Sequence, residues 1–104
     1  MKSYPMTPAL ARREYEFEYQ GGVTTVVLVV GTPAPFLDAP HGDWYCPWTI
    51  QAPHKSWRHY AGGMDELQAL LLAISAIRVE LEQLAKTGKV SWLGSDDLGL
   101  DLTG

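Results

Sequence analysis

The sequence lacks several features that would point directly to a class of function. Its 104 residues include one cysteine, which cannot form an internal disulfide, so a reducing, cytoplasmic setting is the default expectation. No apolar run approaches the roughly 20 residues that span a bilayer, and the first residues lack the continuous apolar stretch of a signal peptide. The net charge of -4 disfavours nonspecific binding to nucleic acid or to an anionic membrane. We therefore expect neither a nucleic-acid partner nor a membrane.

What the sequence does contain is typical of one globular domain. Hydrophobic residues make up 46% of the chain and charged residues 19%, a balance that disordered chains do not show. Residues 1–11 hold two prolines and no period, which predicts a loose N-terminal arm, and residues 94–104 are acidic and glycine-rich, which predicts a tail. We assign the folded domain to residues 12–93.

The first hairpin is indicated by a strict alternation. Residues 12–20 alternate aromatic and charged side chains, which predicts a strand with one dry face and one wet face. A pair of glycines supplies the turn, and the β-branched residues 23–30 form the return strand. A turn at these glycines places Phe17 opposite Val26. The return strand has valines on both faces, so its wet face is either solvated or covered by a second copy or by the C-terminal tail.

A second pair of strands follows a proline-rich loop. Residues 31–42 hold three prolines, and structureless loops of this length are often functional. Residues 43–52 predict a strand whose dry face carries Trp44, Cys46, Trp48 and Ile50. Residues 57–61 predict a short return strand, and a loop centred on residues 54 and 55 places His59 opposite Ile50.

A long amphipathic helix begins at Asp65, a good N-cap, and Gln68 is placed to complete a capping box. Gly88 ends the helix. The apolar stripe that predicts the packed face of the helix consists of Leu67, Leu70, Leu71, Ile74, Ile77, Leu81 and Leu84. Leu72 and Val79 lie off this stripe and are either incidental or a second contact.

These elements predict an α+β fold: an antiparallel four-stranded meander with one long amphipathic helix packed on one face, the aromatic one. Residues 90–93 add a short strand. The expected core combines Phe17, Trp44, Trp48, Leu70 and Ile74.

The chain also resembles a known family. The residues that carry the resemblance are Trp44-x-Cys46 on a strand, the helix opening Gly63-Met64-Asp65-Glu66-Leu67-Gln68-Ala69-Leu70, and Trp92 shortly after the helix. They are similar to a family of small uncharacterised bacterial domains, over roughly residues 12–94. The resemblance implies a small bacterial protein and carries over no catalytic residue.

The reactive side chains have ordinary structural interpretations. Cys46 lies between two tryptophans and is expected to be a buried, small hydrophobe, because a nucleophile needs a base and His59 is too far along the strand. The set His41, Asp43, His54 and His59 matches no zinc spacing, and the position of Asp65 and Glu66 at a helix start is explained by capping. We expect no metal, no cofactor and no catalytic residue.

A small cationic and aromatic cluster is the remaining candidate surface. Trp57, Arg58, His59 and Tyr60 with Lys55 are of the kind that stacks single-stranded bases. The acidic total argues against nucleic acid, and an anionic partner fits this local patch better.

The function that this sequence favours is a non-enzymatic protein-interaction or binding domain whose partner is another protein or a second copy. The alternative is a small ligand-binding protein or enzyme that uses the Pro-rich loop 31–42 and an aromatic/His groove. A concave pocket would favour the ligand, and a flat apolar patch would favour the protein. The candidate partner- or ligand-binding residues are Phe36, His41, Trp57, Arg58, His59, Leu72 and Val79.

Overall fold

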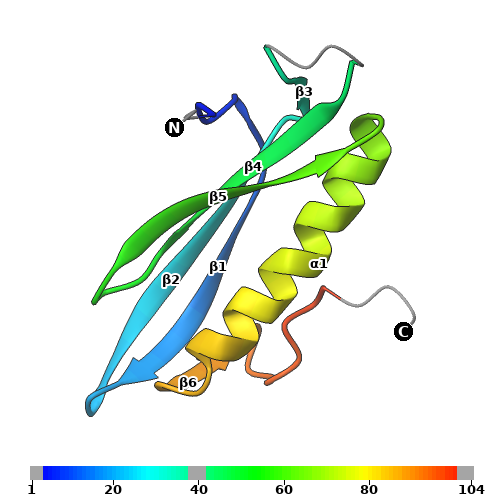
Figure 1. Cartoon of the computed structure of the whole chain (residues 1–104). Helices are drawn as coiled ribbons and strands as arrows, with labels where there is room; N and C mark the ends of the chain where they lie inside the picture. Colours follow the sequence, from blue (N-terminus) through cyan, green and yellow to red (C-terminus); the bar gives the residue numbers. More distant parts are fainter. Residues whose placement is uncertain (1–3, 38–41, 101–104) are drawn as a thin grey trace.

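An antiparallel sheet of six strands carries one helix on one of its faces (Figure 1). The computed structural model describes residues 4–37 and 42–100. The elements in chain order are β1 (Ala9–Tyr19), β2 (Gly22–Gly31), β3 (Ala34–Pro35), β4 (Trp44–Gln51), β5 (Ser56–Gly63), α1 (Glu66–Leu84) and β6 (Lys89–Ser91). The predicted α+β class is confirmed.

The sheet extends the predicted meander at two places. The hairpins β1–β2 and β4–β5 are joined by pairing of β2 with β4, as a meander requires. The short β6 pairs with the free side of β1, and the two-residue β3 pairs with β4 beyond the end of β2. The four strands of the meander are therefore present, β6 corresponds to the short strand predicted at residues 90–93, and β3 was not predicted. The helix packs against β4 and β5.

Both hairpin registers differ from the prediction by two residues. Phe17 pairs with Thr24 rather than Val26, because the turn residues are Gln20 and Gly21, both with positive φ (52° and 79°). In the second hairpin, His59 pairs with Trp48 rather than Ile50. A shift of two residues keeps every side chain on its predicted face, so the assignment of dry and wet faces is unaffected.

The helix begins as predicted and ends earlier. The Asp65 carboxylate accepts a hydrogen bond from the Gln68 N–H (2.7 Å), and the Gln68 side chain accepts one from the Met64 N–H (2.6 Å). The helix ends at Leu84 rather than near Gly88. A Cβ on Gly88 would collide with the backbone of β1, so this glycine is explained by close approach rather than by helix capping.

The packed face of α1 is rotated away from the predicted leucine stripe and toward its alanines. Leu67 and Leu71, which the stripe places in the core, are 63% and 53% exposed. Small side chains let the helix lie close to β4 and β5, and a Cβ on Gly63 would meet the Ala69 backbone nitrogen at 2.5 Å. The buried helix residues are Ala69, Ala73, Ile77, Leu81 and Leu84.

The predicted core is partly correct. Phe17 and Trp48 are buried in the main cluster, and Trp44 and Leu70 pack against it while partly exposed. Ile74 is only half-buried and lines a hollow between α1 and the β1–β2 hairpin. The rotation of the helix accounts for this difference.

Segments at both ends of the chain contact the sheet. The N-terminal three residues of β1 fall within the expected loose arm, and the Tyr45 hydroxyl donates to the Pro5 carbonyl (3.1 Å) on the face opposite α1. On the helix face, the Tyr15 hydroxyl donates to the Leu98 carbonyl (2.9 Å) in the expected tail. The Arg13 guanidinium donates to the same carbonyl (3.1 Å).

Candidate functional site

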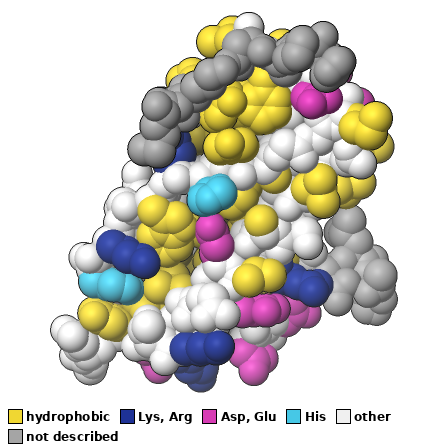
Figure 2. All heavy atoms as spheres, viewed as in Figure 1, with side chains coloured by type: hydrophobic (Ala, Val, Ile, Leu, Met, Phe, Trp, Pro, Cys, Tyr) yellow, Lys and Arg dark blue, Asp and Glu magenta, His cyan; other side chains and the backbone are white. Residues whose placement is uncertain are grey.

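A hollow between β5 and α1, here called the β5–α1 groove, combines charged and aromatic side chains. It has a volume of about 310 Å³. Figure 2 shows histidine, basic and acidic side chains among hydrophobic ones over β5 and α1. The groove is lined by His54, Lys55, Trp57, Val79, Glu80, Gln83, Leu84 and Thr87.

Glu80 binds two tryptophans at the inner side of the groove. The indole N–H groups of Trp48 and Trp57 both donate to Oε2 of Glu80, at 2.8 and 3.0 Å. Trp48 is 1% exposed, so Glu80 satisfies a donor that water does not reach. The register of the second hairpin makes the two tryptophans diagonal neighbours, and the rotation of α1 aims Glu80 between them.

The rim of the groove carries a cation over an aromatic face. The Lys55 Nζ lies 4.8 Å from the centroid of the Trp57 ring. His54 stacks on Tyr19 with 4.7 Å between ring centroids. An aromatic face beside a carboxylate attracts positively charged groups, and Lys55 already makes such a contact.

The β5 edge borders the groove. Among the described residues, β5 pairs with β4 alone. The Nδ1 of His59 lies 2.8 Å from the nitrogen and 2.9 Å from the oxygen of Tyr60, so these two groups point away from β4. Because alternate residues of an antiparallel strand face the same side, the N–H and C=O groups of Arg58 and Gly62 point away from β4 as well.

The predicted site residues fall on different parts of the molecule. Trp57 and Val79 line the groove, and His59 stacks on Trp48 beside it, with 5.5 Å between centroids. Leu72 lies two helical turns before Val79 on the same side of α1. Leu72 and Val79 are 47% and 52% exposed.

The other predicted site residues lie elsewhere. Arg58 pairs with Thr49 of β4, and its side chain lies on the face of the sheet opposite α1. Phe36 is on that face too, stacked on Tyr45 with 5.2 Å between centroids. The structure therefore does not bring Phe36 together with Trp57. His41 lies outside the described residues.

Sequence reasoning missed Glu80, the central residue of the groove. A signal was available, because Glu80 lies three residues after Ile77 and four before Leu84, both of which are buried. A carboxylate on the packed face of a helix needs hydrogen-bond donors. The paired tryptophans of the dry strand face supply them.

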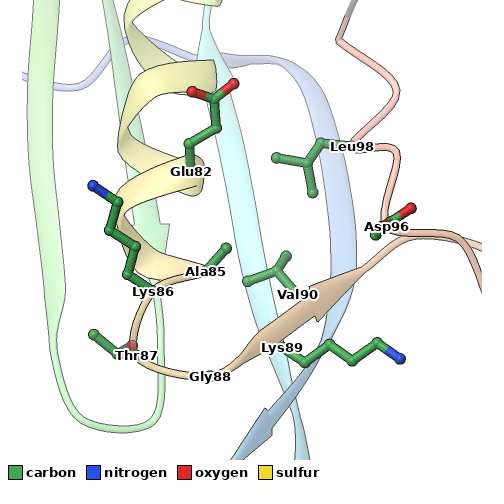
Figure 3. Close-up of a pocket in the computed structure, with 9 residues that line it drawn as sticks. All are labelled: Glu82, Ala85, Lys86, Thr87, Gly88, Lys89, Val90, Asp96 and Leu98. Carbon is green, nitrogen blue, oxygen red and sulfur yellow. The ribbon is translucent and has the colours of Figure 1, made fainter.

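Three further hollows lie along the other side of α1. Figure 3 shows the largest of the three, about 640 Å³, where Ala85, Val90 and Leu98 face one another and the amino groups of Lys86 and Lys89 point away. A smaller one of about 250 Å³ lies between α1 and the β1–β2 hairpin and has a mainly apolar lining. The third, about 390 Å³, is lined by Arg78, Glu82, Asp96, Asp97, Leu98 and Leu100.

Cys46 is buried, as its position on the dry face predicts. Its side chain is 0% exposed, and its sulfur lies 3.4 Å from the Gly31 carbonyl oxygen. Burial raises the pKa of the Cys46 thiol to about 11, so the nucleophilic thiolate is scarce at neutral pH. Within residues 4–37 and 42–100, no group of three or more His, Cys, Asp or Glu side chains could hold a metal ion.

The described part of the chain contains no helix with the length and apolar character needed to cross a membrane.

Comparison with known proteins gives a family and no activity. No curated protein matches the chain, and no solved structure matches it. The family model of DUF6968, a domain of unknown function, matches residues 11–102. This match includes the strand and helix motifs that carried the resemblance, and also much of the acidic tail. The chain therefore belongs to the DUF6968 family of domains of unknown function.

Proposed function

We propose that the protein is a non-enzymatic interaction domain that binds another protein chain by extending its sheet at β5, and that this chain is a second copy of itself. The observation that carries the proposal is the β5 edge. It is eight residues long and contains no proline, and it pairs on one side only among the described residues. Such an edge is a template for a further strand.

The sequence of β5 is complementary to itself in the antiparallel direction. A two-fold axis at Tyr60 places Trp57 opposite Gly63 of the second copy and Arg58 opposite its Gly62. The bulky side chains of Trp57 and Arg58 thus face positions without side chains, Tyr60 faces its own copy, and no like charges are opposed. The same axis brings Lys55 toward Asp65 of the second copy. This complementarity favours a second copy over an unrelated strand.

The flank of α1 beside β5 supports the same arrangement. Leu72 and Val79 are exposed and lie on the side of the helix that faces the edge of the sheet. Two copies related by an axis through the β5 edge carry both helices on the same face of the joined sheet. Burial of these side chains between the helices would remove apolar surface from water.

The experiment is sedimentation of the full chain and two variants of Arg58 at about 50 µM, where a dimer with a Kd of about 1–10 µM is mostly assembled. Arg58→Pro removes an N–H that points away from β4, so it blocks edge pairing and spares the β4–β5 ladder. Arg58→Ala retains that N–H and is the matched control. We expect dimers for the wild type and Arg58→Ala, and a folded monomer for Arg58→Pro.

Two further variants test the geometry. Leu72→Glu places a charge between the helices and should weaken the dimer. His59→Ala frees the main-chain groups of Tyr60 from the imidazole and should strengthen it. A wild-type monomer at this concentration would overturn the proposal, as would a dimer that Arg58→Pro leaves intact.

A further inference from the structure

We infer that the β5–α1 groove is a binding site for an organic cation, either an alkylammonium or a guanidinium group, and that Lys55 occupies part of this site in the structure. The inference goes beyond the proposed interaction through β5, because it assigns a ligand chemistry to the groove itself. Three features of the groove support it.

The first feature is a fixed carboxylate. Oε2 of Glu80 accepts hydrogen bonds from two indoles, and such bonds hold the carboxylate in place. Both bonds end on the same oxygen, so Oε1 is not needed to satisfy either indole. An oriented carboxylate at the inner side of a hollow gives a cation a defined partner.

The second feature is an aromatic face that already attracts a cation. Lys55 Nζ lies 4.8 Å from the Trp57 centroid, within the distance of about 6 Å at which cation–π attraction operates. Lys55 comes from the turn between β4 and β5 and is exposed. It can therefore leave Trp57 for solvent when another cation enters.

The third feature is the size and lining of the groove. A volume of about 310 Å³ accommodates a guanidinium or a tetramethylammonium ion with part of its solvent shell. A metal ion is a poorer fit, because the described residues offer no cluster of three ligands. An inorganic anion could bind Lys55 and His54 at the rim, but the Glu80 carboxylate would repel it.

The test uses the tryptophan indoles as reporters. The chain has four tryptophans, so ¹⁵N-labelled protein gives four indole N–H signals, which single Trp→Phe variants assign. Argininamide and tetramethylammonium are titrated separately at constant ionic strength, and phosphate is titrated as the anion control. We expect both cations to shift the Trp48 and Trp57 signals, while those of Trp44 and Trp92 stay in place.

Three variants decide whether the shifts report the groove. Glu80→Gln keeps an oxygen acceptor for the indoles and removes the charge, and we expect binding to weaken about tenfold. Lys55→Gln removes the competing internal cation, and we expect binding to tighten about two- to fivefold. Lys89→Gln makes the same change of charge on β6 and should leave binding unchanged.

The inference is overturned if neither cation shifts the two indole signals, or if phosphate shifts them equally. It is also overturned if Glu80→Gln binds as the wild type does, or if Lys55→Gln behaves like Lys89→Gln. Because Lys55 and Val79 belong to both the proposed dimer and the groove, the titrations are repeated on Arg58→Pro, which we expect to be monomeric. A monomer that binds cations would contradict only the proposed dimer, and a dimer that does not bind them would contradict only the cation site.

Discussion

Replacing Glu80 tests whether the groove carboxylate also holds the fold together. In Glu80→Ala, the indole N–H of Trp48 loses its acceptor at a site that is 1% exposed. An unsatisfied buried donor costs about 1–3 kcal/mol. Trp57 is only partly buried, so its N–H can bond to water and adds little. We expect the free energy of unfolding to fall by about 2–3 kcal/mol in total.

The conservative variant separates the hydrogen bond from the charge. Glu80→Gln keeps an acceptor and should lose about 1 kcal/mol, the usual difference between charged and neutral hydrogen bonds. Glu82→Ala is the matched control on the same helix. Glu82 is exposed and contacts Arg78 at 3.7 Å, so its loss should cost less than about 0.5 kcal/mol.

The measurement is urea unfolding followed by far-UV circular dichroism and tryptophan fluorescence, with the slope m compared between variants. A fall in the free energy of unfolding of less than about 0.5 kcal/mol for Glu80→Ala would refute the argument, because a buried indole N–H without an acceptor destabilises the fold by more than that. Equal losses for the Ala and Gln variants would also refute it. That result would mean that the acceptor is irrelevant and that only the charge matters.

Four other experiments test the packing. Ile77→Ala should cost about 2–5 kcal/mol and Leu71→Ala less than about 1 kcal/mol by urea unfolding, and the reverse order would contradict the rotation of α1. Thiol labelling of Cys46 should be much slower in the native protein than in urea, and equal rates would contradict its burial. Burial raises the pKa of the Cys46 thiol in the folded protein from 9.0 to about 11. The free energy of unfolding should therefore fall as pH rises from 9 to 11, because the thiol ionises in the unfolded chain before it ionises in the folded protein. The Cys46→Ala variant should show a smaller fall. Gly63→Ala should destabilise the fold, seen as a lower Tm, because its Cβ would meet Ala69.

The faces of the strands could be predicted from the sequence because side-chain alternation does not depend on register. Tyr15 and Phe17 are buried as expected although their partners on β2 are shifted by two residues. The turn itself could not be placed, because Gln20-Gly21 and the two glycines are both compatible with a tight turn. Register followed from the turn, and the predicted pairs were wrong.

The face of α1 that packs on the sheet could not be predicted from the spacing of large apolar residues. The predicted apolar stripe included the leucines at positions 67 and 71, whereas the residues of this part of α1 that are buried against the sheet are Ala69 and Ala73. Close packing favours small side chains where a helix lies directly on strands. The decisive constraint is at Gly63, whose backbone lies against the first turn of α1. The periodicity of apolar residues in the sequence does not indicate this contact.

The groove depends on both of these unpredicted features, which explains why its central residue was missed. The register of β4 and β5 brings Trp57 beside Trp48, and the rotation of α1 turns Glu80 toward both indoles. A buried indole needs an acceptor, and the carboxylate that meets this need also places negative charge beside an aromatic face. The stabilising role and the proposed binding role thus reside in one side chain. The Glu80→Gln variant separates them, because an amide oxygen can still accept from the indoles and cannot attract a cation as a carboxylate does.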